Sequence, residues 1–131
     1  MSSTEKILAA AKAFIGQNTR GLRQAPYRDE CVAAVQEILH RAHLAIIADG
    51  TLGVPNFETQ LPHSGYERTD HPVPGDFVVL GNQDHVGVYL GDGQMVSNSS
   101  TAGKFSWQDT VAAQNESYSG GAFPVHYWHH T

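Results

Sequence analysis

Apolar and polar positions follow a strand-like pattern in one central part of the chain, residues 76–98. Three short apolar runs, at 77–80, 85–90 and 94–98, are separated by glycine-rich breaks at 81–84 and 91–93. β-branched and aromatic residues bounded by such breaks predict a β-meander. In the middle run, aliphatic residues alternate with His85, Gly87 and Tyr89. One face of this strand is therefore aliphatic, and the other face carries His85.

Two stretches before the meander have helical spacing. Ser2 and Glu5 have the spacing of a capping box, and Gly16 ends the apolar pattern that follows them. A second helix is predicted from Asp29, a favourable N-cap residue, to about His43. Its apolar face comprises Cys31, Val35, Ile38, Leu39 and Ala42, which places Cys31 in the first turn.

The remaining segments carry weaker signals. We expect a short helical turn at 56–60, a polar loop at 64–74, a flexible connection at 115–121 and a last strand at 123–128. Residues 105–111 are ambiguous between helix and strand. Helices precede strands along the chain, so the fold class is α+β. A chain of 131 residues forms one domain, 1–131.

Composition excludes several functions. A net charge of -5 and a pI near 5.8 argue against nucleic-acid binding, which needs excess Lys and Arg. No apolar run is long enough to span a membrane, and the N-terminus lacks the pattern of a secretory signal. We therefore expect synthesis in the cytoplasm, with any action outside the cell depending on another delivery route. One cysteine excludes an internal disulfide.

Cys31 is the candidate nucleophile. The start of a helix presents unpaired N–H groups and the positive end of the helix dipole, which stabilise a thiolate. An adjacent imidazole would complete an activated Cys–His pair, and His85 is the candidate base. The alternative is that Cys31 is simply a small apolar residue on the core face of its helix.

A third residue should orient the His85 ring, and strand register leaves two candidates. A two-residue turn at Asp92–Gly93 places Gly87 opposite Asn98, so that Asn98 shares a face with His85. A three-residue loop at 91–93 places Ser97 there instead. We favour Asn98, because its amide oxygen can accept a hydrogen bond from the ring and fix its tautomer.

Neither a metal nor another cofactor is predicted. His40 and His43 lie on one helical face, but no third ligand is spaced to join them. The other histidine group, His126, His129 and His130, lies at the C-terminus. No spacing typical of a zinc site is present.

Three motifs occur together within residues 26–100: a cysteine at the start of an early helix, PGDFVVL at 74–80 and HVGVYLGDGQMV at 85–96. With these motifs the segment resembles the NlpC-type papain-like cysteine peptidases. CHAP amidases and the amidase effectors of type VI secretion are similar. The resemblance implies a papain-like core, in which the N-terminal helix that carries the nucleophile packs on an antiparallel β-sheet that carries the base. It also implies metal-free hydrolysis of amide bonds in peptidoglycan stem peptides. The chain departs from the family at Val32-Ala33, where Ser-Gly is usual, and at Ser97, where the third polar residue is often His.

These observations predict a mechanism and leave rivals open. Cys31 attacks the amide carbonyl, His85 transfers protons, Asn98 orients His85, and the Cys31 backbone N–H stabilises the oxyanion. Tyr27 could line the cleft or bind substrate, as could Ser97. Delivery as a phage lysin or as a secreted effector is expected, with delivery machinery or a cognate inhibitor as partners. The rivals are a glutamine deamidase or transglutaminase-like toxin with the same Cys–His pair, and a non-catalytic binding module.

Overall fold

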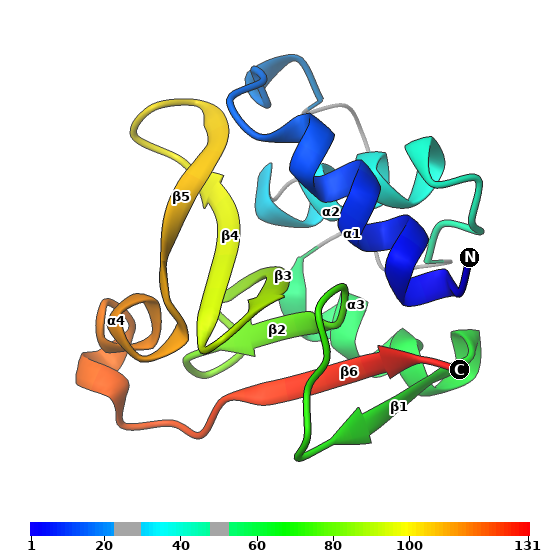
Figure 1. The fold of residues 1–131 in the computed structure, drawn as a ribbon. Coiled ribbons are helices and arrows are strands. Elements are labelled where there is room, and N and C mark those ends of the chain that lie inside the picture. The colour runs from blue at the N-terminus through cyan, green and yellow to red at the C-terminus, as the bar shows by residue number, and fades with distance from the viewer. Residues whose placement is uncertain (23–29, 48–52) are drawn as a thin grey trace.

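The protein has an α+β fold, as predicted, in which helices cover both faces of an antiparallel sheet (Figure 1). The computed structural model describes residues 1–22, 30–47 and 53–131. The α-helices within these ranges are α1 (Ser3–Phe14), α2 (Glu30–Arg41), α3 (Val54–Gln60) and α4 (Val111–Glu116). Three short 3₁₀ turns accompany them, at Arg20–Leu22, Leu61–Ser64 and Ser119–Gly121.

The described residues form one six-stranded sheet with the order β1-β6-β2-β3-β4-β5. All neighbouring strands are antiparallel. The strands are β1 (Tyr66–Thr69), β2 (Phe77–Leu80), β3 (His85–Gly91), β4 (Gln94–Ser99), β5 (Lys104–Thr110) and β6 (His126–His130). The β2–β3–β4 meander therefore lies within the sheet, as its apolar pattern predicts.

Strand alternation divides the core into two parts. On one face, Val79, Val86 and Val96 belong to the main apolar cluster, which also contains buried residues of α1 and α2. On the other face, Leu80 and Met95 pack with Val111 of α4. α2 contacts β3 and β4 directly, and α1 packs against α2. The start of α2 is thereby held close to the central strands of the sheet.

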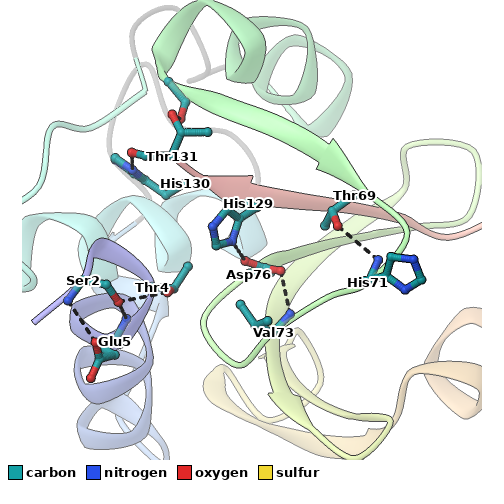
Figure 2. Close-up of polar contacts among 11 residues, drawn as sticks. Ser2, Thr4, Glu5, Thr69, His71, Val73, Asp76, His129, His130 and Thr131 are labelled. Atoms are coloured by element: carbon teal, nitrogen blue, oxygen red, sulfur yellow. Dashed lines mark hydrogen bonds and ion pairs between the residues drawn. The ribbon is translucent and has the colours of Figure 1, made fainter.

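The turn before β2 shows why the motif PGD suits this fold. Gly75 has φ +100°, and a Cβ at this position would lie 2.1 Å from the Thr4 carbonyl oxygen, so only glycine fits. Asp76 is buried and accepts a hydrogen bond from the Val73 N–H at 2.8 Å. Its other carboxylate oxygen lies 2.7 Å from His129 Nδ1 (Figure 2). These contacts fasten the turn to α1 and β6.

The predicted first helix and its capping box are confirmed. Ser2 accepts a hydrogen bond from the Glu5 N–H, and the Glu5 carboxylate accepts from the Ser2 N–H (Figure 2). Gly16 follows the helix with φ +88°. The second helix is also confirmed, although its predicted cap Asp29 lies outside the described residues.

The structure changes the predictions for three weaker segments and decides the ambiguous one. The expected polar loop at 64–74 contains β1, which pairs with β6 although its residues are mostly polar. The ambiguous segment 105–111 is strand up to Thr110, within β5, and its last residue, Val111, begins α4. The expected connection at 115–121 overlaps the end of α4 and a 3₁₀ turn. The Thr110 side chain caps the start of α4 by accepting a hydrogen bond from the Ala113 N–H. The last strand is shifted to residues 126–130.

None of the helices in the described ranges has the length and hydropathy that a membrane-spanning segment needs.

Candidate active site

A cavity of about 540 Å³ lies where the start of α2 meets the start of β3 and the end of β4. It brings together side chains from five segments of the chain between residues 30 and 118. Its lining combines a thiol, an imidazole, carboxylates, hydroxyls and two large aromatic rings. The lining residues are Glu30, Cys31, Asp84, His85, Asn98, Ser99, Ser100, Thr101, Trp107 and Tyr118.

Cys31 is the second residue of α2 and is 6% exposed. Its side chain belongs to the main apolar cluster, as expected for a small apolar residue on the core face of the helix. It also lines the cavity, as expected for a candidate nucleophile. The backbone N–H groups of a first helical turn lack partners within the helix. Together with the helix dipole, they favour negative charge on a thiol placed there.

His85 begins β3 and is equally well buried. Its ring stacks on Tyr118, with centroids 5.2 Å apart, and lies 5.6 Å from the tilted ring of Trp107. Burial lowers the pKa of His85 from 6.5 to about 4, because the cavity disfavours the charged imidazolium. At neutral pH the ring is therefore neutral and can accept a proton.

The predicted register between β3 and β4 is wrong by one residue. Gly87 pairs with Ser97, not with Asn98. The two-residue turn at Asp92–Gly93 is present, closed by the pair Gly91 and Gln94, but the ladder shifts between Tyr89 and Gly91. A β-bulge adds one residue to one strand and so moves every later pair. Ser97 consequently shares the face of His85, and Asn98 lies on the opposite face.

Asn98 is buried, and its hydrogen bonds lead toward α2. Its side-chain oxygen accepts from the Thr19 hydroxyl, and its Nδ2 lies 3.5 Å from a carboxylate oxygen of Glu30. Glu30 directly precedes Cys31. Asn98 thus lines the same cavity as Cys31 and His85, but its hydrogen bonds connect strand β4 with Thr19 and with Glu30 at the start of α2.

Ser97 is fully buried and hydrogen-bonded to a residue that sequence reasoning did not identify. Its hydroxyl donates to Gln114 Oε1 at 2.6 Å, and Gln114 Nε2 donates to the Trp107 carbonyl at 2.9 Å. Trp107, Gln114 and Tyr118 belong to segments whose sequence patterns were weak. The only sequence signal for the two of them that line the cavity, Trp107 and Tyr118, is that they are aromatic. Tyr27 lies outside the described residues.

Across residues 1–22, 30–47 and 53–131, no three potential metal ligands are grouped. His126 lies 2.8 Å from Glu58, and His129 lies 2.7 Å from Asp76, so each of these rings has a carboxylate partner. The cavity lining contains both a thiol and a neutral imidazole, two groups that suit nucleophilic and acid–base catalysis.

Both the sequence and the fold of this chain are similar to those of known proteins. The sequence matches the model of the NlpC/P60 family over residues 23–126. The fold is similar to that of a chain in the crystal structure of the type VI native effector–immunity complex Tae3–Tai3 from Ralstonia pickettii. That match has a TM-score of 0.66 at 13% sequence identity and covers 99% of this chain and 100% of the other. Among curated proteins, no match was found.

Proposed function

The chain belongs to the NlpC/P60 family, and from this premise we propose that it is a cysteine hydrolase cleaving amide bonds in peptidoglycan stem peptides. One observation carries the proposal: Cys31 at the start of α2 and His85 at the start of β3 line the same cavity. The two residues are 54 positions apart, and only the packing of α2 on β3 and β4 brings them together. A thiol and an imidazole in one cleft form the basis of covalent amide hydrolysis.

The proposed reaction proceeds through an acyl-enzyme. The Cys31 thiol transfers its proton to His85, and the sulfur attacks the amide carbonyl carbon to form a C–S bond. The Cys31 backbone N–H stabilises the oxyanion of the tetrahedral intermediate. The C–N bond then breaks as His85 returns the proton to the leaving amine. Water, deprotonated by His85, hydrolyses the thioester and restores the thiol.

The electrostatics of His85 support its role as the base. Because burial lowers its pKa to about 4, the ring is neutral before the reaction starts. A base must be unprotonated to accept the thiol proton, and the helix start favours the thiolate that results. The stacked Tyr118 ring covers part of the imidazole and helps to keep water away from it.

Digestion of purified peptidoglycan tests the proposal. Released fragments are identified by mass spectrometry for the wild type, Cys31→Ala and His85→Ala. We expect both variants to lose hydrolysis while circular dichroism shows an unchanged fold. Lys12→Ala, on exposed α1 surface remote from the cavity lining, is the control and should retain full activity. An unchanged rate in Cys31→Ala would refute the mechanism. Ammonia release from protein glutamine without cleavage of muropeptides would instead identify a deamidase.

Delivery to the wall is a separate part of the proposal. The Ralstonia pickettii structure with the same fold is named as an effector–immunity complex. By analogy of fold alone, we propose that this chain is delivered as an effector and is inhibited by a cognate immunity protein. Expression in a Gram-negative host tests where it acts. We expect lysis when the protein is exported to the periplasm and normal growth when it stays in the cytoplasm. Equal growth in both cases would contradict a role in wall hydrolysis.

A further inference from the structure

We propose that Arg20 is a positioning residue for substrate binding, which holds one hydroxyl-bearing side of the cavity in place. This side, the hydroxyl wall, consists of Ser99, Ser100 and Thr101, at the end of β4 and in the loop that leads to β5. Arg20 is not among the lining residues and acts only through this wall. The inference rests on the proposed function, since it concerns how a stem peptide is held during hydrolysis.

The hydroxyl wall offers polar groups to a bound peptide. Ser100 and Thr101 are exposed and line the cavity, so a substrate in the cavity can reach their side chains. A hydroxyl both donates and accepts hydrogen bonds, which suits the amide and carboxylate groups of a stem peptide. Because these exposed residues bury little apolar surface, hydrogen bonds must fix their position.

The Arg20 guanidinium supplies such bonds from outside the cavity. Its Nη2 donates to the Ser100 carbonyl oxygen at 3.4 Å and to the Thr101 carbonyl oxygen at 3.2 Å. The positive charge of the donor strengthens both bonds. These two bonds, the Arg20 clamp, hold the backbone of two successive residues and leave their hydroxyl groups available to a substrate.

Gly103 provides the space that the guanidinium occupies. A Cβ at position 103 would lie 2.5 Å from Arg20 Cζ and 2.6 Å from one of its terminal nitrogens. Gly103 also has a φ of +67°, in the left-handed region that favours glycine. A side chain at this position would therefore strain the loop and displace Arg20 from the hydroxyl wall.

The backbone around Arg20 is joined to the same loop. The Arg20 N–H donates to Asn18 Oδ1 at 2.9 Å, and the Thr19 N–H donates to the Gly103 carbonyl at 2.9 Å. Asn18 also forms an antiparallel bridge with Lys104, the first residue of β5. Arg20 is thus fixed at its backbone as well as at its guanidinium. A wall that is already ordered lowers the entropic cost of binding a peptide.

Amide hydrogen exchange tests the Arg20 clamp without substrate. The Ala102 and Gly103 N–H groups both donate to Ser99 and report on the order of the loop. In Arg20→Ala we expect both to exchange roughly tenfold faster, because the loop opens more often without the clamp. Arg68→Ala is the matched control. Arg68 is an exposed arginine on β1, at the opposite edge of the sheet, and its loss should leave both rates unchanged.

Hydrolysis kinetics test the effect on binding. In Arg20→Ala we expect KM for a muropeptide to rise roughly three- to tenfold with kcat within about twofold of the wild type, since the substrate itself must then order the wall. A merely structural role for Arg20 would lower the melting temperature without raising KM alone. Arg68→Ala should change neither KM nor kcat.

A pair of glycine variants tests the steric relation between Gly103 and Arg20. Gly103→Ala should raise KM as Arg20→Ala does. Gly93→Ala has a similar left-handed backbone, but its Cβ meets nothing within 4 Å, so KM should not change. In the Arg20→Ala background, Gly103→Ala should raise KM little further, because the guanidinium that it displaces is already absent.

The possible outcomes separate this inference from the proposed function. Unchanged exchange of the loop amides in Arg20→Ala would overturn the Arg20 clamp. Faster exchange with an unchanged KM would overturn its role in substrate binding. If the wild type cleaves no peptidoglycan, the proposed function fails and the binding role fails with it, whereas faster exchange would still show that Arg20 fixes the hydroxyl wall.

Discussion

The rings of His85 and Tyr118 are stacked at an interplanar angle of 19°, with centroids 5.2 Å apart. Tyr118 follows α4, whereas His85 begins β3, so the contact joins two elements distant in sequence. It places a flat apolar surface against one side of the imidazole. Because desolvation is what lowers the pKa of His85, the stacked ring links the position of Tyr118 to the charge of the base.

Replacing Tyr118 should change the titration of His85. In Tyr118→Ala, water reaches the ring, and we expect the pKa of His85 to rise from about 4 toward 6.5. An NMR titration of the imidazole measures this shift. Tyr127→Ala is the control, because Tyr127 packs edge-on against Tyr89 on the same sheet without contacting His85. The proposed role of Tyr118 fails if the His85 titration is the same in Tyr118→Ala and the wild type.

His85 should also make stability depend on pH. Its pKa is about 4 in the folded protein and 6.5 when exposed. Between these values the unfolded chain binds more protons, so stability falls as the pH falls from about 6.5 to about 4. Urea unfolding across this range measures the loss. In His85→Gln this component should be absent, and the pH curve should be flatter. Identical slopes for the two proteins would show that His85 is charged in the fold.

Asn98 should support the start of α2, not the tautomer of His85. In Asn98→Ala the buried Thr19 hydroxyl loses its acceptor, and we expect a loss of roughly 1–3 kcal/mol in unfolding free energy. Hydrolysis should also fall, because Glu30 next to Cys31 loses its contact with β4. The His85 tautomer, followed by NMR, should not change.

A double-mutant cycle with Thr19→Val separates this contact from general damage. If the Thr19–Asn98 hydrogen bond is the cause, the two losses in unfolding free energy should not add. A changed His85 tautomer in Asn98→Ala would contradict this assignment. It would return Asn98 to the role of orienting the base.

The parts of the fold that could be predicted from sequence are those with local signals. The capping box at Ser2 and Glu5, the apolar face of α2 and the glycine-bounded runs of the meander each depend on neighbouring residues. The placement of Cys31 in the first turn of α2 and of His85 at the start of β3 followed from the same signals. Their presence in one cavity depends on tertiary packing, which the family resemblance implied.

The parts that could not be predicted depend on non-local pairing. The bulge after Tyr89 changes the partner of Gly87 from Asn98 to Ser97, although the turn residues Asp92 and Gly93 were correctly identified. β1 has a polar sequence and is a strand because β6 pairs with it. Gln114 has no sequence signal of its own, because its hydrogen bonds to Ser97 and Trp107 form only where α4 packs against the sheet.

Gly87 should be intolerant of a side chain. A Cβ at this position would lie 2.6 Å from the Val96 carbonyl oxygen and 2.8 Å from the Ser97 Cβ. Because the nearest of these atoms belongs to the backbone, Gly87→Ala should push β3 away from β4. We expect this change to lower the unfolding free energy by roughly 1–3 kcal/mol and to remove most of the activity. Gly93→Ala is the control, since its Cβ would meet nothing within 4 Å. Its left-handed φ of +75° should cost about 1 kcal/mol and leave hydrolysis unchanged. Equal activity in the two variants would contradict the steric argument.

Glu58 should stabilise the fold through its negative charge. Burial raises the pKa of Glu58, but hydrogen bonds from Trp128, Gln83 and His126 outweigh this effect, so the net pKa is lowered. A lowered carboxyl pKa gives stability that is present at neutral pH and is lost as the pH falls through the folded-state value.

In Glu58→Gln we expect a loss of roughly 1.5–3 kcal/mol of unfolding free energy at pH 7, measured by urea unfolding. Because the wild-type carboxylate is neutralised in acid, the difference between the two proteins should shrink toward pH 3. Glu37→Gln, which breaks only the partly exposed pair with Arg41, should cost under about 1 kcal/mol. A difference for Glu58→Gln that is the same at both pH values would show that shape, not charge, accounts for its contribution.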